Sequence, residues 1–309
     1  MQSVKIAVVG SLVVDLTVLT PRLPRRGENL LAERLQVGPG GKGANAAVAA
    51  RRLGADVLLV GCVGDDAFGR QEMDALQQEG VDLQGVRVTP HAQTGAAVIL
   101  VEETGENTIL VAVGANDHLT PHDVEAALGP HLGVLRAVLV DFEVPAACVR
   151  AAVELSRAHR IPVLVDTGPA RPYGPEVWGG ATILSPNREE AAGLAGYPID
   201  TDADVRRAAR DLLGRGPEAV VLRLGSEGAF LCAAQTEALV PGFRVRAVDT
   251  TGAGDAFMGA LTVAVAEGMP LREAVRFANA AGAVATTRVG TLPVMPFRTE
   301  VTALLAASS

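Results

Sequence analysis

The stretch VDTTGAGDAF, from Val248 to Phe257, decides how the rest of the chain is interpreted. It follows an alternating run, residues 243–248, that predicts a strand, and it leads into an apolar run that predicts a helix from Ala256. A glycine-rich turn between a strand and a helix presents unpaired backbone N–H groups at the positive end of the helix dipole. We therefore expect an anion such as a phosphate to bind at this turn.

Asp255, at the end of the turn, has two interpretations. A carboxylate repels the anion that the amides attract, which makes sense if Asp255 accepts a proton from a hydroxyl that attacks phosphorus. An aspartate at the start of a helix is also a common cap. This stretch alone leaves both interpretations open.

The composition indicates a large folded protein that does not bind nucleic acid. The 309 residues are 49% hydrophobic, which is enough to bury the core of one large α/β domain or of two smaller ones. The net charge is -8 and the longest basic runs are pairs such as Arg25-Arg26, so we expect no basic surface for nucleic acid. Aromatic residues make up only 3%, which leaves few rings on which bases could stack.

The cysteines and the first residues predict a cytoplasmic protein. Cys62, Cys148 and Cys232 are odd in number, far apart and embedded in apolar runs, as expected of core thiols in a reducing compartment. Residues 4–9 predict a strand rather than a signal peptide, and no apolar run is long enough to span a bilayer. We expect no membrane partner.

Two pairs of extended segments predict a small sheet outside the main one. Residues 12–20 and 30–37 are separated by a turn, and Asp15 is the one charge in the first of them. Because its neighbours are too apolar for a freely solvated strand, we expect Asp15 to face a polar ligand. Residues 95–101 and 107–113 flank a polar turn, which predicts a hairpin that joins the same small sheet.

A second glycine-rich segment, residues 38–45, opens an alanine-rich helix that we expect to end near Leu53. Its glycines match the dinucleotide-binding pattern, but they do not close the first strand of a βαβ unit, and no Gly-Lys-Ser/Thr sequence is present. The segment offers a second helix N-terminus with Lys42 and Asn45 as polar side chains. A plain tight turn into a packed helix is the alternative.

From residue 134 onward, apolar strands alternate regularly with helices, which predicts a parallel sheet covered on both faces. Polar residues follow these strands at their carboxyl ends, where such sheets bind ligands. They are Glu143, Asp166, Asn187 with Glu190, and Arg223 followed by Gly225-Ser226-Glu227-Gly228. Each could be an ordinary cap or turn residue, but their position on one edge favours a site. His118 and His122 lie on either side of a helix start and do not form a metal pair.

Four motifs in this order resemble those of the ribokinase-type (pfkB-type) sugar kinases, and the resemblance covers the whole chain. They are residues 40–45, residues 61–69, the Asn187-x-x-Glu190 set and residues 249–255. The resemblance implies an α/β, ribokinase-like fold with a mostly parallel central sheet, helices on both faces and a small β-sheet lid. It implies one kinase domain over residues 1–309, with lid segments at about 12–37 and 94–113 inserted in it.

The resemblance also implies the reaction. The chain would be an ATP-dependent, Mg²⁺-requiring kinase that phosphorylates the primary hydroxyl of a small sugar, with ribose first and fructose, 2-keto-3-deoxygluconate or a nucleoside as alternatives. A homodimer formed through the lid is expected by the same resemblance. The exposed edges and apolar alternation of the lid strands support that expectation.

Residue by residue, the resemblance makes Asp255 the catalytic base and the amides of Gly252, Ala253 and Gly254 the anion hole. The sugar side would be Asp15, Gly41, Lys42, Asn45 and Glu143. The nucleotide side would be Asn187, Arg223, Gly225, Ser226, Glu227, Gly228, Gly254 and Asn279. Asn187 and Glu190 would organise Mg²⁺ through water, and a K⁺ site would comprise Asp249, Thr251, Ala285, Arg288 and Gly290.

The chain departs from the family pattern at several positions. Val13 stands where ribokinases carry an asparagine, so one hydroxyl contact is lost. Ala46 replaces a common glutamine, residues 166–170 only loosely match an asparagine-proline sequence, and Val294 stands where a hydroxyl can complete the K⁺ cage. These differences leave the identity of the sugar open.

Two rival functions come from other classes. A non-catalytic sugar or nucleotide sensor with this fold would need a broken Asp255 or anion hole, and both are intact in the sequence. A nicotinamide dehydrogenase rests only on the glycine pattern of residues 38–43, which stands in the wrong place.

Overall fold

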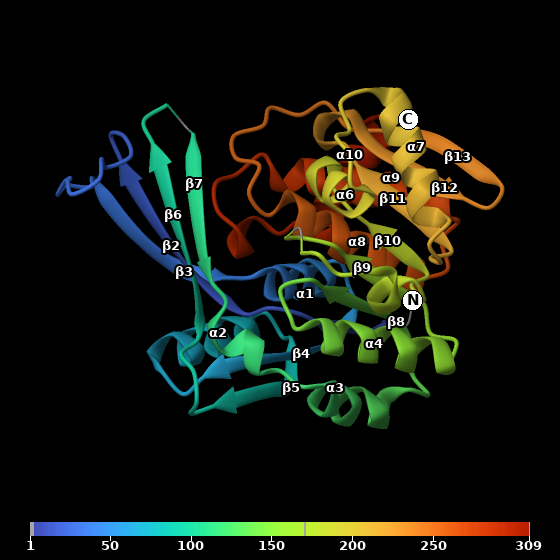
Figure 1. The fold of residues 1–309 in the computed structure, drawn as a ribbon, viewed down its shortest axis with the longest axis horizontal. Helices are drawn as coiled ribbons and strands as arrows, with labels where there is room; N and C mark the ends of the chain where they lie inside the picture. Colours follow the sequence, from blue (N-terminus) through green and yellow to red (C-terminus); the bar gives the residue numbers. More distant parts are fainter. Residues whose placement is uncertain (1–2, 105, 170, 309) are drawn as a thin grey trace.

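The computed structural model describes residues 3–104, 106–169 and 171–308, and in them the chain forms two separate β-sheets (Figure 1). The larger sheet has nine strands in the order β13-β12-β11-β10-β9-β8-β1-β4-β5, and the smaller has four in the order β3-β2-β6-β7. Gly105, in the predicted hairpin turn, and Ala170, in the segment after β9, lie outside the described residues.

The larger sheet is parallel from β5 to β11, and its last two strands, β12 and β13, are antiparallel. This confirms the predicted mostly parallel sheet. Its strands are β1 (Lys5–Val9), β4 (Asp56–Gly64), β5 (Asp82–Thr89), β8 (Leu135–Asp141), β9 (Val163–Asp166), β10 (Ile183–Ser185), β11 (Ala219–Arg223), β12 (Gly228–Ala233) and β13 (Thr236–Pro241).

Helices cover both faces of this sheet, and alternate strand residues supply the two resulting cores. In β1, Ile6 and Val8 belong to one buried cluster while Ala7 and Val9 belong to the other, as the period of two requires. The helices are α1 (Lys42–Arg52), α2 (Ala67–Gln78), α3 (Pro121–Leu128), α4 (Ala146–Ala158), α5 (Pro175–Trp178), α6 (Arg188–Ala195), α7 (Asp202–Leu213), α8 (Ala253–Ala266), α9 (Leu271–Ala285) and α10 (Arg298–Ala307).

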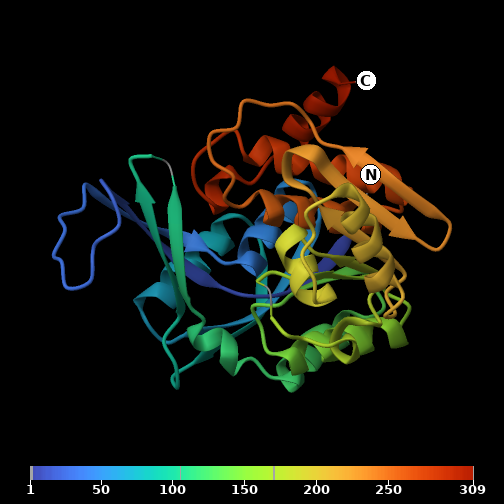
Figure 2. The same cartoon turned by 45° about the horizontal axis from the view of Figure 1, so that its top comes forward.

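The smaller sheet projects from the body of the molecule as a lid (Figure 1, Figure 2), and its base packs against α2. It contains β2 (Val13–Thr20), β3 (Arg34–Gly40), β6 (Gly95–Glu102) and β7 (Asn107–Ala112). Strand β2 pairs in parallel with β6 and antiparallel with β3, and β6 and β7 form the predicted hairpin. The fold class predicted from the sequence is therefore confirmed.

Three local predictions were wrong. Residues 243–248 form a loop, because no neighbouring strand is available to them beyond the edge strand β13. Their alternation reflects a loop in which Phe243 and Val245 line a cavity. Strand β3 begins later than expected and runs through residues 38–40 of the glycine-rich segment that was predicted to open α1. Strands β5, β12 and β13 were not predicted. None of the helices in the described part of the chain is long and apolar enough to cross a bilayer.

Candidate active site

A cavity of about 900 Å³ lies between the lid and the edge of the large sheet where its parallel strands end. The structure brings most of the predicted site residues to its wall. They are Asp15, Gly41, Lys42, Asn45, Glu143, Asn187, Glu190, Arg223, Gly225, Ser226, Gly228, Thr251, Gly252, Ala253, Gly254, Asp255 and Asn279. Six other predicted residues are not part of this wall: Asp166, Glu227, Asp249, Ala285, Arg288 and Gly290.

The glycine-rich turn 252–254 forms the start of α8, as the sequence predicted. Gly252 is the N-cap and has φ 76°, a left-handed conformation that favours glycine. No side chain caps this helix, and the residues of its first turn line the cavity, although the Ala253 N–H donates a 3.3 Å hydrogen bond to the Thr250 carbonyl oxygen. The geometry suits an anion at the positive end of α8.

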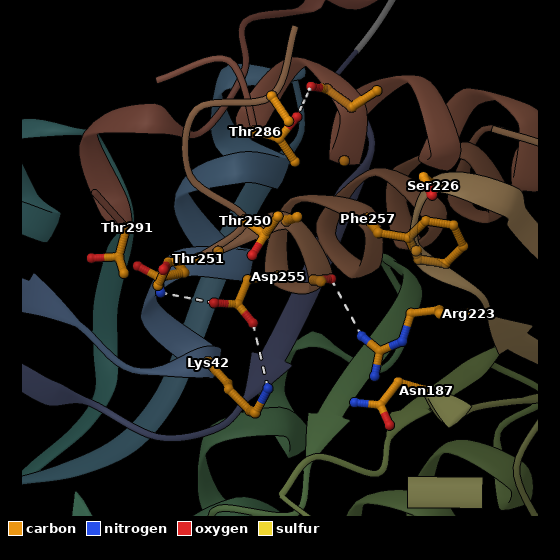
Figure 3. Close-up of a pocket in the computed structure, with 18 of the residues that line it drawn as sticks. Lys42, Asn187, Arg223, Ser226, Thr250, Thr251, Asp255, Phe257, Thr286 and Thr291 are labelled. Atoms are coloured by element: carbon orange, nitrogen blue, oxygen red, sulfur yellow. Dashed lines mark hydrogen bonds and ion pairs between the residues drawn. The ribbon is translucent and has the colours of Figure 1, made fainter. Parts of the chain in front are cut away.

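Asp255 does not cap α8; its carboxylate instead contacts side chains from α1 (Figure 3). Asp255 Oδ2 accepts a 2.8 Å hydrogen bond from Asn45 Nδ2, and Asp255 Oδ1 lies 3.7 Å from Lys42 Nζ. Burial raises the pKa of Asp255 to about 6, although Lys42 and Asn45 oppose the increase. A carboxylate with such a pKa is a better proton acceptor near neutral pH than an ordinary aspartate.

The lid contributes Asp15 and Val13 from the same face of β2. Asp15 Oδ2 accepts a 2.8 Å hydrogen bond from Thr291 Oγ1, and burial raises the pKa of Asp15 to about 6. The Val13 side chain is buried in the wall of the cavity, beside this carboxylate along the strand. Thr291 was not found by sequence reasoning, because it reaches Asp15 from a loop 276 residues away and belongs to no motif.

Ser11 is a second residue that sequence reasoning missed. Its hydroxyl donates to a Glu143 carboxylate oxygen and accepts a 3.0 Å hydrogen bond from the Lys42 backbone N–H. It thereby joins the end of β8 to the start of α1. The only sequence signal was its place in the Gly-Ser break after the first strand.

A row of alternating charges crosses the floor of the cavity. Asp166 Oδ1 lies 2.7 Å from Arg223 Nη2, and Asp166 Oδ2 lies 3.9 Å from Lys42 Nζ. Arg223 Nη2 also lies 2.9 Å from Glu190 Oε2. Burial tends to lower the pKa of Lys42, but Asp166 and Asp255 raise it above its ordinary value, so the side chain stays charged.

Asn187 and Glu190 form the capping box at the start of α6. Glu190 Oε2 accepts hydrogen bonds from the Asn187 backbone N–H, Thr167 Oγ1 and Arg223, and Oε1 accepts one from Asn187 Nδ2. Because its oxygens are already occupied, this carboxylate fits a metal ion held through water better than one bound directly. Within the described residues, no group of three or more His, Cys, Asp or Glu could bind a metal.

The predicted K⁺ residues lie in and around the loop after α9. Asp249 Oδ1 accepts hydrogen bonds from the N–H and Oγ1 of Thr251, and Oδ2 accepts a 3.0 Å hydrogen bond from the Gly290 N–H. Arg288 pairs with Glu300 at 3.0 Å, and Ala285 is the last residue of α9. On the nucleotide side, Glu227 pairs with Arg188 at 2.9 Å, pointing away from the cavity that its neighbours line.

The end of the cavity near Asn279, here called the slot, is lined by both polar and apolar residues. Asn279 Nδ2 donates to the backbone carbonyls of Val240 and Pro241, at 2.9 and 3.2 Å, and so fixes the loop after β13. Phe243 and Ala283 line the slot beside it. A flat heterocycle is the shape that such a slot accommodates.

The cavity under the lid holds a buried carboxylate beside an uncapped helix start, and comparison with known proteins identifies the family. The family model for pfkB family carbohydrate kinases matches residues 3–298. The chain belongs to this family, and it is an ATP-dependent sugar kinase.

Three relatives illustrate the similarity. The ribokinase of Bacillus subtilis is 39% identical over 301 residues, covering 97% of this chain and 99% of the relative. The deoxyribokinase of Salmonella typhimurium is 36% identical over 292 residues, covering 94% and 95%. The structure of Arabidopsis thaliana ribokinase complexed with ribose and ATP has a TM-score of 0.90 and 32% identity, covering 98% of this chain and 99% of that one.

Proposed function

We propose that this chain transfers the γ-phosphoryl group of ATP to the primary hydroxyl of a free pentose, with ribose as the first candidate. The observation that carries the proposal is the position of Asp255, whose carboxylate lies between the sugar-side residues of α1 and the N–H groups of α8. The ribokinase relatives and the ribose and ATP complex of the Arabidopsis protein support the choice of sugar.

In this reaction Asp255 accepts the proton of the primary hydroxyl while its oxygen forms a bond to phosphorus. The bond between phosphorus and the ADP oxygen breaks, and negative charge spreads over the equatorial oxygens. The amides of Gly254 and Asp255 at the start of α8 lie beside that charge, so they stabilise it without reorganising. Asp15, Asn45 and Glu143 offer carboxylate and amide groups to the remaining sugar hydroxyls.

The nucleotide occupies the other half of the cavity, with its base in the slot beside Asn279 and its phosphates toward α8. A Mg²⁺ ion, which would neutralise charge on the transferring and leaving oxygens, would be held through water by Glu190 and Asn187. The saturated hydrogen bonding of Glu190 supports an outer-sphere role.

A second candidate is 2-deoxyribose, and Val13 is the observation that favours it. An apolar wall at Val13 offers no partner to one sugar hydroxyl, and a sugar that lacks a hydroxyl would not leave a group unpaired there. The similarity to a deoxyribokinase is consistent with this reading.

One assay separates these candidates. ADP formation is measured with ATP against ribose, 2-deoxyribose, fructose, 2-keto-3-deoxygluconate and a nucleoside, for the wild type and for Val13→Asn. If Val13 selects against one hydroxyl, Val13→Asn raises kcat/KM for ribose relative to 2-deoxyribose by roughly 5- to 150-fold, equivalent to about 1 to 3 kcal/mol. An unchanged ratio would make Val13 ordinary strand core, and no turnover of any sugar would refute the proposed function.

Four further features belong to the same proposal. The chain acts as one kinase domain with an inserted lid, and two lids associate in a homodimer through the face that points away from the cavity. K⁺ binds beside Asp249 and fixes the loop that carries the anion hole. The three cysteines are buried and unpaired, which supports a reducing, cytoplasmic location.

A further inference from the structure

Arg223 is the last residue of β11 and points into the cavity below the start of α8 (Figure 3). Its Nη2 contacts Asp166 at 2.7 Å and Glu190 at 2.9 Å, and its Nη1 donates a 3.5 Å hydrogen bond to the Gly254 carbonyl oxygen. Only 9% of the residue is exposed. In Figure 3 Lys42 lies below Asp255 and Arg223 lies to its right.

These contacts leave part of the hydrogen-bonding capacity of the Arg223 guanidinium unfilled. One nitrogen, Nη2, makes both ion pairs, Nη1 makes one long hydrogen bond, and the buried Nε has no partner. An arginine whose task was to neutralise Asp166 would form two parallel hydrogen bonds with that carboxylate, because its donors are spaced for them. Nη1, with a single long hydrogen bond, therefore retains donor capacity for a further acceptor that enters the site.

The position of Arg223 indicates what that acceptor is. A Cβ atom added to Gly254 would lie 3.0 Å from Arg223 Nη1, so the guanidinium touches the turn whose amides face the cavity. An anion held by those amides therefore lies beside Arg223. Burial tends to lower the pKa of Arg223, but Asp166 and Glu190 raise it above its ordinary value, so the side chain stays cationic.

Asp166 links this cation to the second one. Its two oxygens face Arg223 and Lys42, at 2.7 and 3.9 Å, and Lys42 in turn lies 3.7 Å from Asp255. The order Glu190, Arg223, Asp166, Lys42, Asp255 alternates in sign across the floor of the cavity. A carboxylate shared between two cations fixes both of them without neutralising either completely.

We propose that Arg223 is a catalytic cation that contacts the transferring phosphoryl group from the nucleotide side, and that Asp166 is a positioning residue that holds Arg223 and Lys42 on its two sides. This rests on the proposed phosphoryl transfer. As the bond to the sugar oxygen forms and the bond to ADP breaks, the proton goes to Asp255 and charge accumulates on the equatorial oxygens. Arg223 donates a hydrogen bond to those oxygens from its Nη1 group.

The competing reading is that Arg223 only neutralises Asp166 and Glu190. Both readings predict that Arg223→Gln destabilises the protein, because it leaves buried carboxylates unpaired. The double variant Arg223→Gln/Asp166→Asn separates them, since it removes one positive and one negative charge together. Its thermal stability should return toward the wild-type value under either reading.

The decisive measurements are kcat, both KM values and Tm for the wild type, Arg223→Gln, Arg223→Lys and the double variant. Arg210→Gln is the matched control, because it breaks an exposed arginine pair with Glu237 at 2.6 Å, outside the cavity wall. We expect both Gln variants to lower kcat by about 1,000-fold, as for other arginines that contact a transferring phosphoryl group, with the KM for sugar nearly unchanged. Arg223→Lys should recover part of this loss, and added ethylguanidinium should raise kcat of the double variant.

A second readout does not depend on turnover. ADP with aluminium fluoride mimics the transferring group, and calorimetry should show that the double variant loses much more affinity for this mixture than for ADP alone. A double variant with normal Tm and with kcat within about threefold of the wild type would overturn the role of Arg223. Failure of the wild type to phosphorylate any sugar would instead overturn the proposed function, and this inference with it.

Discussion

Asn45 Nδ2 donates a 2.8 Å hydrogen bond to Asp255 Oδ2 across 210 residues of chain. Asn45 lies in the first turn of α1 and Asp255 in the first turn of α8. Their contact links the proposed sugar-binding residues of α1 to the proposed base. The amide holds one carboxylate oxygen, and Lys42 lies near the other. The orientation of Asp255 toward an incoming hydroxyl is therefore fixed by the protein before the substrate arrives.

Asp255→Asn should nearly abolish turnover while leaving the binding of ATP and sugar largely intact. The change removes a proton acceptor and keeps the shape, and loss of one general base commonly costs roughly 100- to 10,000-fold. Steady-state rates and titration calorimetry with each ligand measure the two effects. Asp65→Asn is the control, because this aspartate is exposed and pairs only with Arg70. Turnover within about threefold of wild type would remove Asp255 from the reaction.

The pH profile of kcat/KM should fall on the acid side near pH 6. Burial raises the pKa values of Asp15 and Asp255 to about 6, and both must be ionised to accept hydrogen bonds or a proton. Two groups titrating together should give a limiting slope of about two on a logarithmic plot. Thr291→Val removes a hydrogen bond that lowers the pKa of Asp15, so it should move part of this limb to higher pH.

Unfolding is not the cause of that acid loss. The pKa values of these two groups lie above the unfolded value of 3.8, so between these limits the folded state binds more protons. Their contribution to the free energy of unfolding is fully present below about pH 4 and is lost as the pH rises through 6. A Tm that falls in parallel with kcat/KM on the acid side, or a profile that stays flat to about pH 5, would contradict the assignment.

K⁺ should raise kcat with little effect on either KM. An oxygen cage beside Asp249 would fix the loop that carries the anion hole and would not touch the substrate. Rates in tetramethylammonium buffer, with and without K⁺ at matched ionic strength, measure the effect, and Asp249→Asn should remove it. Equal rates would leave Asp249 as a cap that accepts the N–H groups of Thr251 and Gly290.

The lid should hold two chains together. Leu35, Val37 and Leu110 are exposed on it, and strand pairing places them opposite the face that carries Val13 and Asp15. Light scattering should give about twice the 31.8 kDa chain mass, and Val37→Arg should reduce it to the monomer value. Leu239→Arg, at an exposed position on β13, is the control that should leave the dimer intact. A monomer mass at every concentration would refute the dimer.

Glu72→Leu should stabilise the protein. The Glu72 side chain on α2 is fully buried, and neither carboxylate oxygen makes a hydrogen bond of good geometry. Burial raises the pKa of Glu72 well above its ordinary value; the Gly40 backbone N–H opposes this and Asp15 adds to it. A buried, unsatisfied carboxyl group costs about 1 to 3 kcal/mol or more, and the cost grows as the pH rises.

Thermal melts at about pH 5 and pH 8 measure this effect, and the gain in Tm should be larger at the higher pH. Glu154→Leu is the control, because its carboxylate is exposed and lies 4.0 Å from Arg150. A lower Tm for Glu72→Leu at the higher pH would mean that the carboxylate has a partner.

The sequence was most informative where structure is local. The glycine turn before α8 and the hairpin of β6 and β7 are each encoded within a few residues, so pattern and chemistry predicted them. Thr291 was missed because its contact with Asp15 exists only after distant segments pack. Residues 243–248 were assigned to a strand because a loop with one face on a cavity has the same alternation as a half-buried strand.

Gly259 leaves no side chain between α1 and α8: a Cβ atom there would lie 2.6 Å from the Ala46 carbonyl oxygen and 2.8 Å from Ala49 Cβ. Gly259 is one turn along α8 from Asp255, and Ala46 follows Asn45. The distance between the Asp255 carboxylate and the Asn45 amide is therefore set by the spacing of the two helix backbones rather than by side-chain length. Substitutions at the rim of the cavity can change which sugars bind. The distance between α1 and α8 cannot change in the same way. A larger residue at position 259 would move the two helices apart and weaken the contact between Asn45 and Asp255 for every substrate.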